Sequence, residues 1–237
     1  EAPHLTAANF AGLTSPAYAY TPYVPEAERH LKKPEWLNDP IYYHNRGEST
    51  FKGESSQFGD FVGLDDVFTE NPRVVQGFID IYGQWIDDYG IDGFRIDTAR
   101  HVNPEFWQAF VPAMLARAKA KGMANFHIFG EVMEFAPGEL ARATRVSGLP
   151  AVNDFALQGA LVDAIAKDGP TSRITDVFRE DVLYADGEKT AAKLVTLTGN
   201  HDVFRFARAV REARPQATLD DIMRRVRLAY AVIFFSR

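Results

Sequence analysis

The sequence predicts an α/β fold, and within that class part of a (β/α)8 barrel preceded by an irregular, loop-rich segment. Three observations lead to this prediction. Strand-like and helix-like patterns alternate from residue 69 onward, which is typical of parallel strands joined by helical crossovers. Residues 1–68 are instead rich in Pro, Gly, Tyr and Asn and show no sustained periodicity. Finally, Arg95 and Asp97 share one face of a strand whose other face is apolar.

The regular part of the chain begins with a helix and a strand, and this cycle repeats. Asn71 is a suitable N-cap, Pro72 fits the first helical position, and Gly90 ends the apolar periodicity before a strand at about 91–97. The later elements that we expect are a helix from Asn103-Pro104 to Gly122, the strand "NFHIFGE", a helix near 137–147, a strand near 150–155, two helical stretches between about 157 and 182, a strand at "KLVTLTGN" and a helix from Thr218.

The charged residues of the first strand favour a barrel over an open sheet. In "GFRID", Phe94 and Ile96 lie on one face, and Arg95 and Asp97 lie on the other. Helices cover both faces of an open doubly wound sheet, so an ion pair there would carry a large desolvation cost. In a barrel the pair points inward, and Asp97 at the carboxyl end of the strand reaches the open mouth.

Two further predicted strands also end in acidic residues. "FHIFGE" finishes at Glu131, and "LVTLTGNHD" runs into Asn200, His201 and Asp202. Because the carboxyl ends of barrel strands meet at one mouth, we expect Asp97, Glu131 and Asp202 to converge on one pocket.

Composition excludes several classes of function. The chain has 237 residues, 46% of them hydrophobic, and can bury a sizeable core. Its net charge of −6 and the lack of a dense basic cluster argue against a nucleic-acid partner, and no apolar run is long enough to predict a membrane partner. The absence of cysteine excludes disulfides and thiolate metal sites and leaves the compartment undetermined, with a secreted or periplasmic location favoured over the cytoplasm.

Three motifs resemble a known family. "DGFRIDTARHV", "IFGEVME" and "LTGNHDVFRFA" occur in this order and resemble three short regions of the α-amylase family, glycoside hydrolase family 13. "GLDDVFTENP" resembles a fourth region. The resemblance covers about 60–237 and implies strands 4 to 7 of that family's barrel, with residues 1–68 as the domain inserted after the third strand. Because the chain stops before an eighth strand, and half a barrel would expose apolar faces, we expect a segment of a longer polypeptide.

The resemblance implies a catalytic trio. Asp97 is the nucleophile, Glu131 the general acid/base, and Asp202 the carboxylate that binds sugar hydroxyls and stabilises the transition state. A retaining glycosidase needs one ionised carboxylate and one protonated carboxyl group about 5 Å apart. Arg95, on the same strand face, predicts that Asp97 is the ionised one. We therefore expect a retaining hydrolase that cleaves α-glucosidic bonds of starch-like glucans or maltooligosaccharides, without an organic cofactor.

Further residues are assigned by the same resemblance. Arg95, His201, Arg100 and His101 are the expected substrate-binding residues, although Arg100 stands where many members have Lys. The family often offers the backbone carbonyl at the position of His101 to calcium, and Asp66 aligns with a calcium-binding carboxylate in some members. Oxygen ligands suit calcium, so Asp66 and His101 are the candidate metal ligands.

Other readings remain open. An α-glucosidase or a glucanotransferase of the same family would give different products from maltooligosaccharides. A non-catalytic glucan-binding module would bind without turnover, and a metal-dependent hydrolase lacks the expected paired-His spacing. His44 and His127 receive no role, because a loop position and a packed barrel position explain them.

Overall fold

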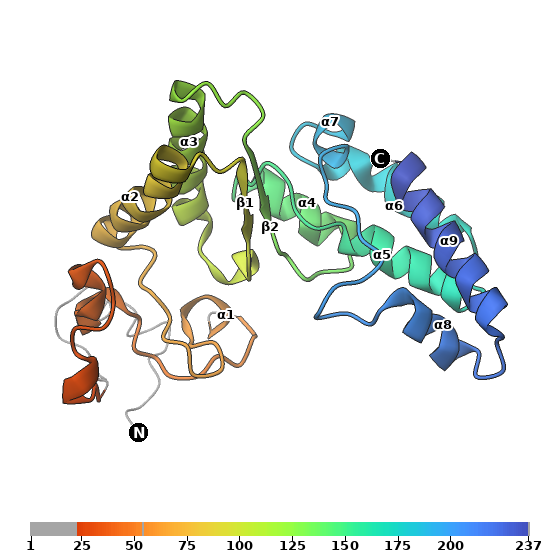
Figure 1. Ribbon diagram of the computed structural model, residues 1–237, viewed down its shortest axis with the longest axis horizontal. Coiled ribbons are helices and arrows are strands. Elements are labelled where there is room, and N and C mark those ends of the chain that lie inside the picture. The colour runs from red at the N-terminus through yellow and green to blue at the C-terminus, as the bar shows by residue number, and fades with distance from the viewer. Residues whose placement is uncertain (1–22, 54, 237) are drawn as a thin grey trace. The chain divides into compact units, whose positions relative to one another are not determined.

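The computed structural model describes residues 23–53 and 55–236 of the chain (Figure 1). These residues form two compact units. The first unit contains the described residues up to Gly90 together with His101–Arg117, and the second contains Ile91–Arg100 together with the residues from Ala118 onward. Of the predicted insert at residues 1–68, residues 1–22 and 54 lie outside the described part of the chain.

Short helical turns joined by extended segments make up the N-terminal part of the first unit. They are 3-10 turns at Glu26–Glu28 (η2), Glu35–Asn38 (η3) and Pro40–Tyr42 (η4), and one α-helical turn at Ser55–Phe58 (α1). Strand-like pairing among the described residues of this segment is limited to isolated bridges. This irregular structure agrees with the composition, because Pro and Gly interrupt regular backbone hydrogen bonding.

The first long helix, α2, spans Pro72–Tyr89 and begins and ends where the sequence predicts. The side-chain oxygen of Asn71 accepts a hydrogen bond from the backbone N–H of Arg73 at 2.9 Å, which caps the helix. Gly90 ends it in the left-handed conformation with φ of 61°, which glycine adopts without steric cost.

Helix α3, Pro104–Ala120, lies beside α2 (Figure 1). Aromatic side chains of the two helices are in contact. The ring centroids of Phe78 and Phe106 lie 6.1 Å apart, and those of Tyr82 and Phe110 lie 5.6 Å apart, both in edge-to-face geometry. Phe106 and Phe110 are buried in this contact, whereas Tyr82 lies at its exposed edge.

The second unit is built on parallel strands. Strand β1, Gly93–Ile96, pairs with β2, His127–Gly130. Single parallel bridges continue the ladder from Gly130 to Val152 and from Asn153 to Val195. The four segments therefore lie side by side in chain order, as consecutive strands of a barrel do.

The last two of these segments correct an expectation. A short strand was expected near 150–155 and another strand at "KLVTLTGN", but the structure has only the bridges at Val152, Asn153 and Val195 there. Among the described residues, the segment at Val195 has a bridge partner only on the side of Asn153. A segment that is hydrogen-bonded on one side loses half of the pairing that stabilises a central strand, so its ladder is short.

Helices follow β2 and the later strand segments of the second unit. They are α4 (Pro137–Arg145), α5 (Phe155–Leu161) with a π-helical continuation (Val162–Ala166), α6 (Ser172–Arg179) with a 3-10 turn η7 (Glu180–Leu183), α7 (Glu188–Ala191), α8 (Phe206–Ala213) and α9 (Leu219–Phe235). Ile128 and Val152 are fully buried, as are Leu140 of α4 and Leu157 of α5. None of the helices in the described ranges has the length and apolar character needed to span a bilayer.

Candidate active site

The carboxyl end of β1 carries Arg95 and Asp97 on one face, as the alternation of the strand predicts. Nη1 of Arg95 forms an ion pair with Oδ1 of Asp97. The Asp97 side chain is 63% exposed, so it remains accessible to a ligand while it is paired. The next residue, Thr98, has a left-handed backbone with φ of 48°, which a branched residue adopts only under local constraint. The chain then enters a 3-10 turn at Ala99–His101 (η5).

Glu131 is fixed against this turn. The residue is 6% exposed, and its Oε2 accepts a hydrogen bond from the backbone N–H of Thr98 at 2.9 Å. Its own N–H donates to the carbonyl of Ile96 at 2.7 Å, and its carbonyl accepts from the N–H of Ala99 at 3.0 Å. Two backbone hydrogen bonds thus hold Glu131 against the end of β1, and a third fixes its carboxyl group beside Thr98, the residue that follows Asp97.

The ladder register adds a residue that the sequence did not single out. Ile96 is opposite Gly130, and Gly130 is bridged to Val152. Continuing the alternation by one residue beyond β1, β2 and the bridge at Val152 places Asp97, Glu131 and Asn153 in one row on one face. Asn153 is 7% exposed, and its Oδ1 is buried without a hydrogen-bond partner among the described residues. The alternation within 150–155 was the signal that could have identified it.

The third motif forms a compact turn. Asn200 Oδ1 accepts hydrogen bonds from the backbone N–H groups of Asp202 and Val203, each at 2.9 Å. This Asx-type turn presents the two following side chains outward. Nε2 of His201 lies 3.2 Å from Oδ2 of Asp202, and the two side chains are 70% and 37% exposed. His201 and Asp202 therefore act as a pair on the surface of the second unit.

Arg100 is turned toward the loop that follows Glu131. Its Nη1 lies 2.7 Å from Oε1 of Glu134 and 3.2 Å from the carbonyl oxygen of Met133. The guanidinium thereby ties η5 to the segment after β2. This position suits a residue that orders the loop after Glu131, in addition to the substrate contact expected from the sequence.

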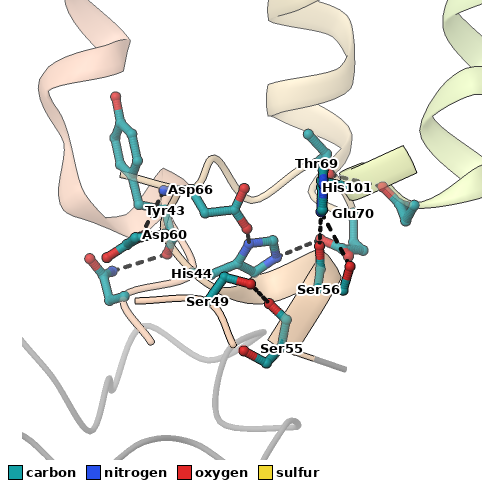
Figure 2. A network of polar contacts seen from close by, with 12 residues as sticks. Tyr43, His44, Ser49, Ser55, Ser56, Asp60, Asp66, Thr69, Glu70 and His101 are labelled. Carbon is teal, nitrogen blue, oxygen red and sulfur yellow. Dashed lines mark hydrogen bonds and ion pairs between the residues drawn. The ribbon is translucent and has the colours of Figure 1, made fainter. Parts of the chain in front are cut away.

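The two candidate calcium ligands, Asp66 and His101, lie in the first unit. The carboxylate of Asp66 and the ring of His101 both have polar partners there. Asp66 Oδ2 lies 2.5 Å from Nδ1 of His44, whose Nε2 lies 2.7 Å from Glu70 Oε2 (Figure 2). Nδ1 of His101 lies 2.8 Å from the carbonyl oxygen of Ser56. Within the described ranges, no group of three or more His, Cys, Asp or Glu side chains is arranged to hold a metal ion. Asp66 and His101 therefore belong to no such group, and the calcium assignment, which for His101 concerns its backbone carbonyl, stays a prediction.

His44 is a second residue to which the sequence analysis gave no role. It was expected to be a loop residue, but its side chain is fully buried between two carboxylates. Its ring also lies 5.0 Å from the centroids of Phe58 and Phe68. Burial opposes the charge on the ring, but the hydrogen bonds to Asp66 and Glu70 outweigh it and raise the pKa of His44.

Comparison with known proteins finds sequences similar to this chain. The family model "Alpha amylase, catalytic domain" matches residues 18–235. An α-amylase of Streptomyces lividans is 40% identical over 228 residues, which cover 96% of this chain and 25% of that protein.

Solved structures give the same result. An α-amylase of Anoxybacillus superposes with a TM-score of 0.71 and 27% identity, covering 86% of this chain and 43% of that one. The α-amylase of Geobacillus thermoleovorans complexed with acarbose superposes with a TM-score of 0.69 and 28% identity, covering 84% and 43%. The chain thus spans a quarter of the Streptomyces protein and less than half of either solved structure.

Proposed function

This chain belongs to the α-amylase family, glycoside hydrolase family 13, and we propose that it contributes the catalytic centre of an enzyme that hydrolyses α-glucosidic bonds of starch-like glucans or maltooligosaccharides with retention of configuration. The observation that carries this proposal is the hydrogen bond from the N–H of Thr98 to Glu131, which places one carboxyl group beside the end of the strand that bears the other.

The spacing of the strands favours retention over inversion. Asp97 and Glu131 lie in one row on adjacent strands, and adjacent strands are about 4.8 Å apart. Retaining enzymes hold their carboxyl groups about 5 Å apart, whereas inverting enzymes need about 6.5–9.5 Å to admit a water molecule. Neighbouring side chains of one row match the shorter distance.

We assign the steps accordingly. A carboxylate oxygen of Asp97 attacks the anomeric carbon while Glu131 gives its proton to the departing glycosidic oxygen, which leaves a glycosyl ester on Asp97. Glu131 then takes a proton from water, the water oxygen bonds to the anomeric carbon, and the ester bond breaks. Arg95 holds Asp97 in place for the attack. Asp202, with His201, binds ring hydroxyls through bonds that tighten in the transition state.

The anomeric configuration of the first product tests this assignment. Proton NMR of maltopentaose hydrolysis by the full-length polypeptide should show the α-anomer forming before mutarotation, and Asp97→Asn should abolish the signal. A β-anomer formed first would refute retention. Transfer products at early times would favour a glucanotransferase, and binding of glucans without turnover would favour a non-catalytic module.

We further propose that residues 1–237 expressed alone have little glycosidase activity. The described residues supply four strand segments, and a site assembled from several strand ends needs the complete mouth. A reducing-sugar assay on soluble starch compares this chain with the full-length polypeptide. Comparable rates per molecule would contradict the proposal.

A further inference from the structure

A cavity of about 580 Å³ lies within the second unit, beside the pair formed by His201 and Asp202. Asp202 forms part of its wall. Residues of α5, of its π-helical continuation and of α6 line the rest, together with Phe135 after β2 and Phe204 before α8. The volume falls within the range of about 300–1,000 Å³ that is usual for small-molecule sites.

Two aromatic rings of this cavity are exposed. Phe135 is 49% exposed and Phe204 is 54% exposed, and Phe204 is held in place by the guanidinium of Arg208, 4.1 Å from the ring centroid. Gly159 of α5 lets Phe135 approach the helix, because a Cβ there would lie 3.0 Å from the ring. Such rings offer flat apolar faces, which match the C–H faces of a pyranose ring.

A buried amide also faces this cavity. Gln158 is 4% exposed and lines the cavity. Its side chain has no hydrogen-bond partner among the residues that the structure describes. Its amide atoms are also not among the unpaired side-chain atoms of these residues that solvent cannot reach. A buried amide that is neither paired nor sealed faces the open space beside it. Because the amide is open to the cavity, it can donate to and accept from the hydroxyl groups of a ligand bound there.

The charges around the cavity select a neutral ligand. Four carboxylates (Asp163, Asp176, Glu180 and Asp202) and two cationic groups (Lys167 and Arg173) line it. Lys167 is paired with Asp163 at 2.9 Å, and Arg179 from outside the lining is paired with Asp176 at 3.2 Å, which leaves Glu180 and Asp202 against Arg173 as a small surplus of negative charge. This surplus repels phosphates and other anions. Neutral hydroxyl groups both donate to carboxylates and accept from the guanidinium of Arg173.

From these observations we propose that the cavity is a binding subsite for a further glucosyl residue of the same α-glucan chain that is cleaved beside Asp202. Phe135 and Phe204 stack on the sugar, and Gln158 hydrogen-bonds one of its hydroxyls. This inference rests on the proposed function, and it assigns to Phe135, Phe204 and Gln158 the selection of longer over shorter glucans.

Calorimetric titration with maltohexaose tests the proposal in the full-length polypeptide carrying Glu131→Gln to prevent turnover. Phe204→Ala and Gln158→Met should each weaken binding about fivefold, since a stacked ring or a hydrogen bond is worth about 1 kcal/mol. Val182→Ala is the matched control, because Val182 is 70% exposed on η7 and lies outside the cavity. Circular dichroism establishes that each variant is folded.

The outcomes separate this inference from the proposed function. If the Glu131→Gln polypeptide binds maltohexaose and both cavity variants bind it as tightly as Val182→Ala does, the subsite is refuted while the proposed function stands. If the polypeptide without substitutions neither binds nor cleaves any α-glucan, both are refuted. A loss confined to the two cavity variants supports the subsite.

Discussion

Replacing His44 with Gln should destabilise the first unit. Nδ1 of His44 lies 2.5 Å from Asp66 and Nε2 lies 2.7 Å from Glu70, and the ring itself has no exposure. Removing one member of a buried ion pair costs about 3–5 kcal/mol. The Asp66 and Glu70 side chains are 24% and 23% exposed, so water solvates them in part. We therefore expect a loss of about 3 kcal/mol near pH 6, or roughly a hundredfold in the ratio of folded to unfolded molecules.

The loss should depend on pH with a definite sign. Although burial opposes it, hydrogen bonding to the two carboxylates raises the folded-state pKa of His44 above its unfolded value, which is about 6.5. The stabilisation from such a group is complete below the unfolded pKa and is lost as pH rises through the folded pKa. The difference in unfolding free energy between the natural sequence and His44→Gln should therefore be largest near about pH 6 and shrink toward about pH 9.

Urea unfolding followed by tryptophan fluorescence measures this difference. The three tryptophans of the chain, Trp36, Trp85 and Trp107, all belong to the first unit, so the signal reports that unit. His30→Gln is the matched control, because His30 contacts a glutamate at the same 2.5 Å but is 78% exposed, and it should leave the midpoint unchanged. A loss under about 1 kcal/mol for His44→Gln, or a loss that is independent of pH, would refute a cationic His44.

Three predictions concern the catalytic row of the full-length polypeptide. Asp97→Asn should lower turnover of an aryl maltoside by several powers of ten while maltooligosaccharide binding is retained, because an amide has the shape of the carboxylate but is a poor nucleophile. Glu131→Ala should impair both steps, and added azide should restore turnover of the activated substrate and yield an α-glycosyl azide, identified by NMR, because two inversions restore the original configuration. Asn153→Ala should lower kcat/KM about tenfold, measured on the same aryl maltoside, because it removes an amide that lies in the row of Asp97 and Glu131.

Each of these predictions has a contrary outcome. More than about a tenth of the turnover left in Asp97→Asn, a loss of under about 1.4 kcal/mol, would exclude Asp97 as the nucleophile. A β-glycosyl azide from Glu131→Ala would indicate a single displacement and end the retaining assignment. An unchanged kcat/KM in Asn153→Ala would refute a contribution of Asn153 to catalysis. Glu139→Gln, an exposed position in the first turn of α4, is the control that should leave all rates unchanged.

The sequence alone determined the features that depend on neighbours along the chain. The ends of α2 follow from Asn71, Pro72 and Gly90, whose capping and left-handed preferences act within a few residues. The pairing of Arg95 with Asp97 likewise follows from strand alternation, because the two residues are separated by one position. The family could also be predicted from the sequence, because its motifs are short runs of neighbouring residues.

Only the tertiary structure decided the features that join distant segments. The row of Asp97, Glu131 and Asn153 depends on the register between strands, which hydrogen bonds across the sheet set. His44 is a central ion-pair residue because chain folding brings Asp66 and Glu70, more than twenty positions later, onto its two nitrogens. Neither the row nor the ion pairs of His44 leave a periodic pattern in the sequence. Both depend on burial and pairing between segments that are far apart in the chain, which the packing of a whole unit decides.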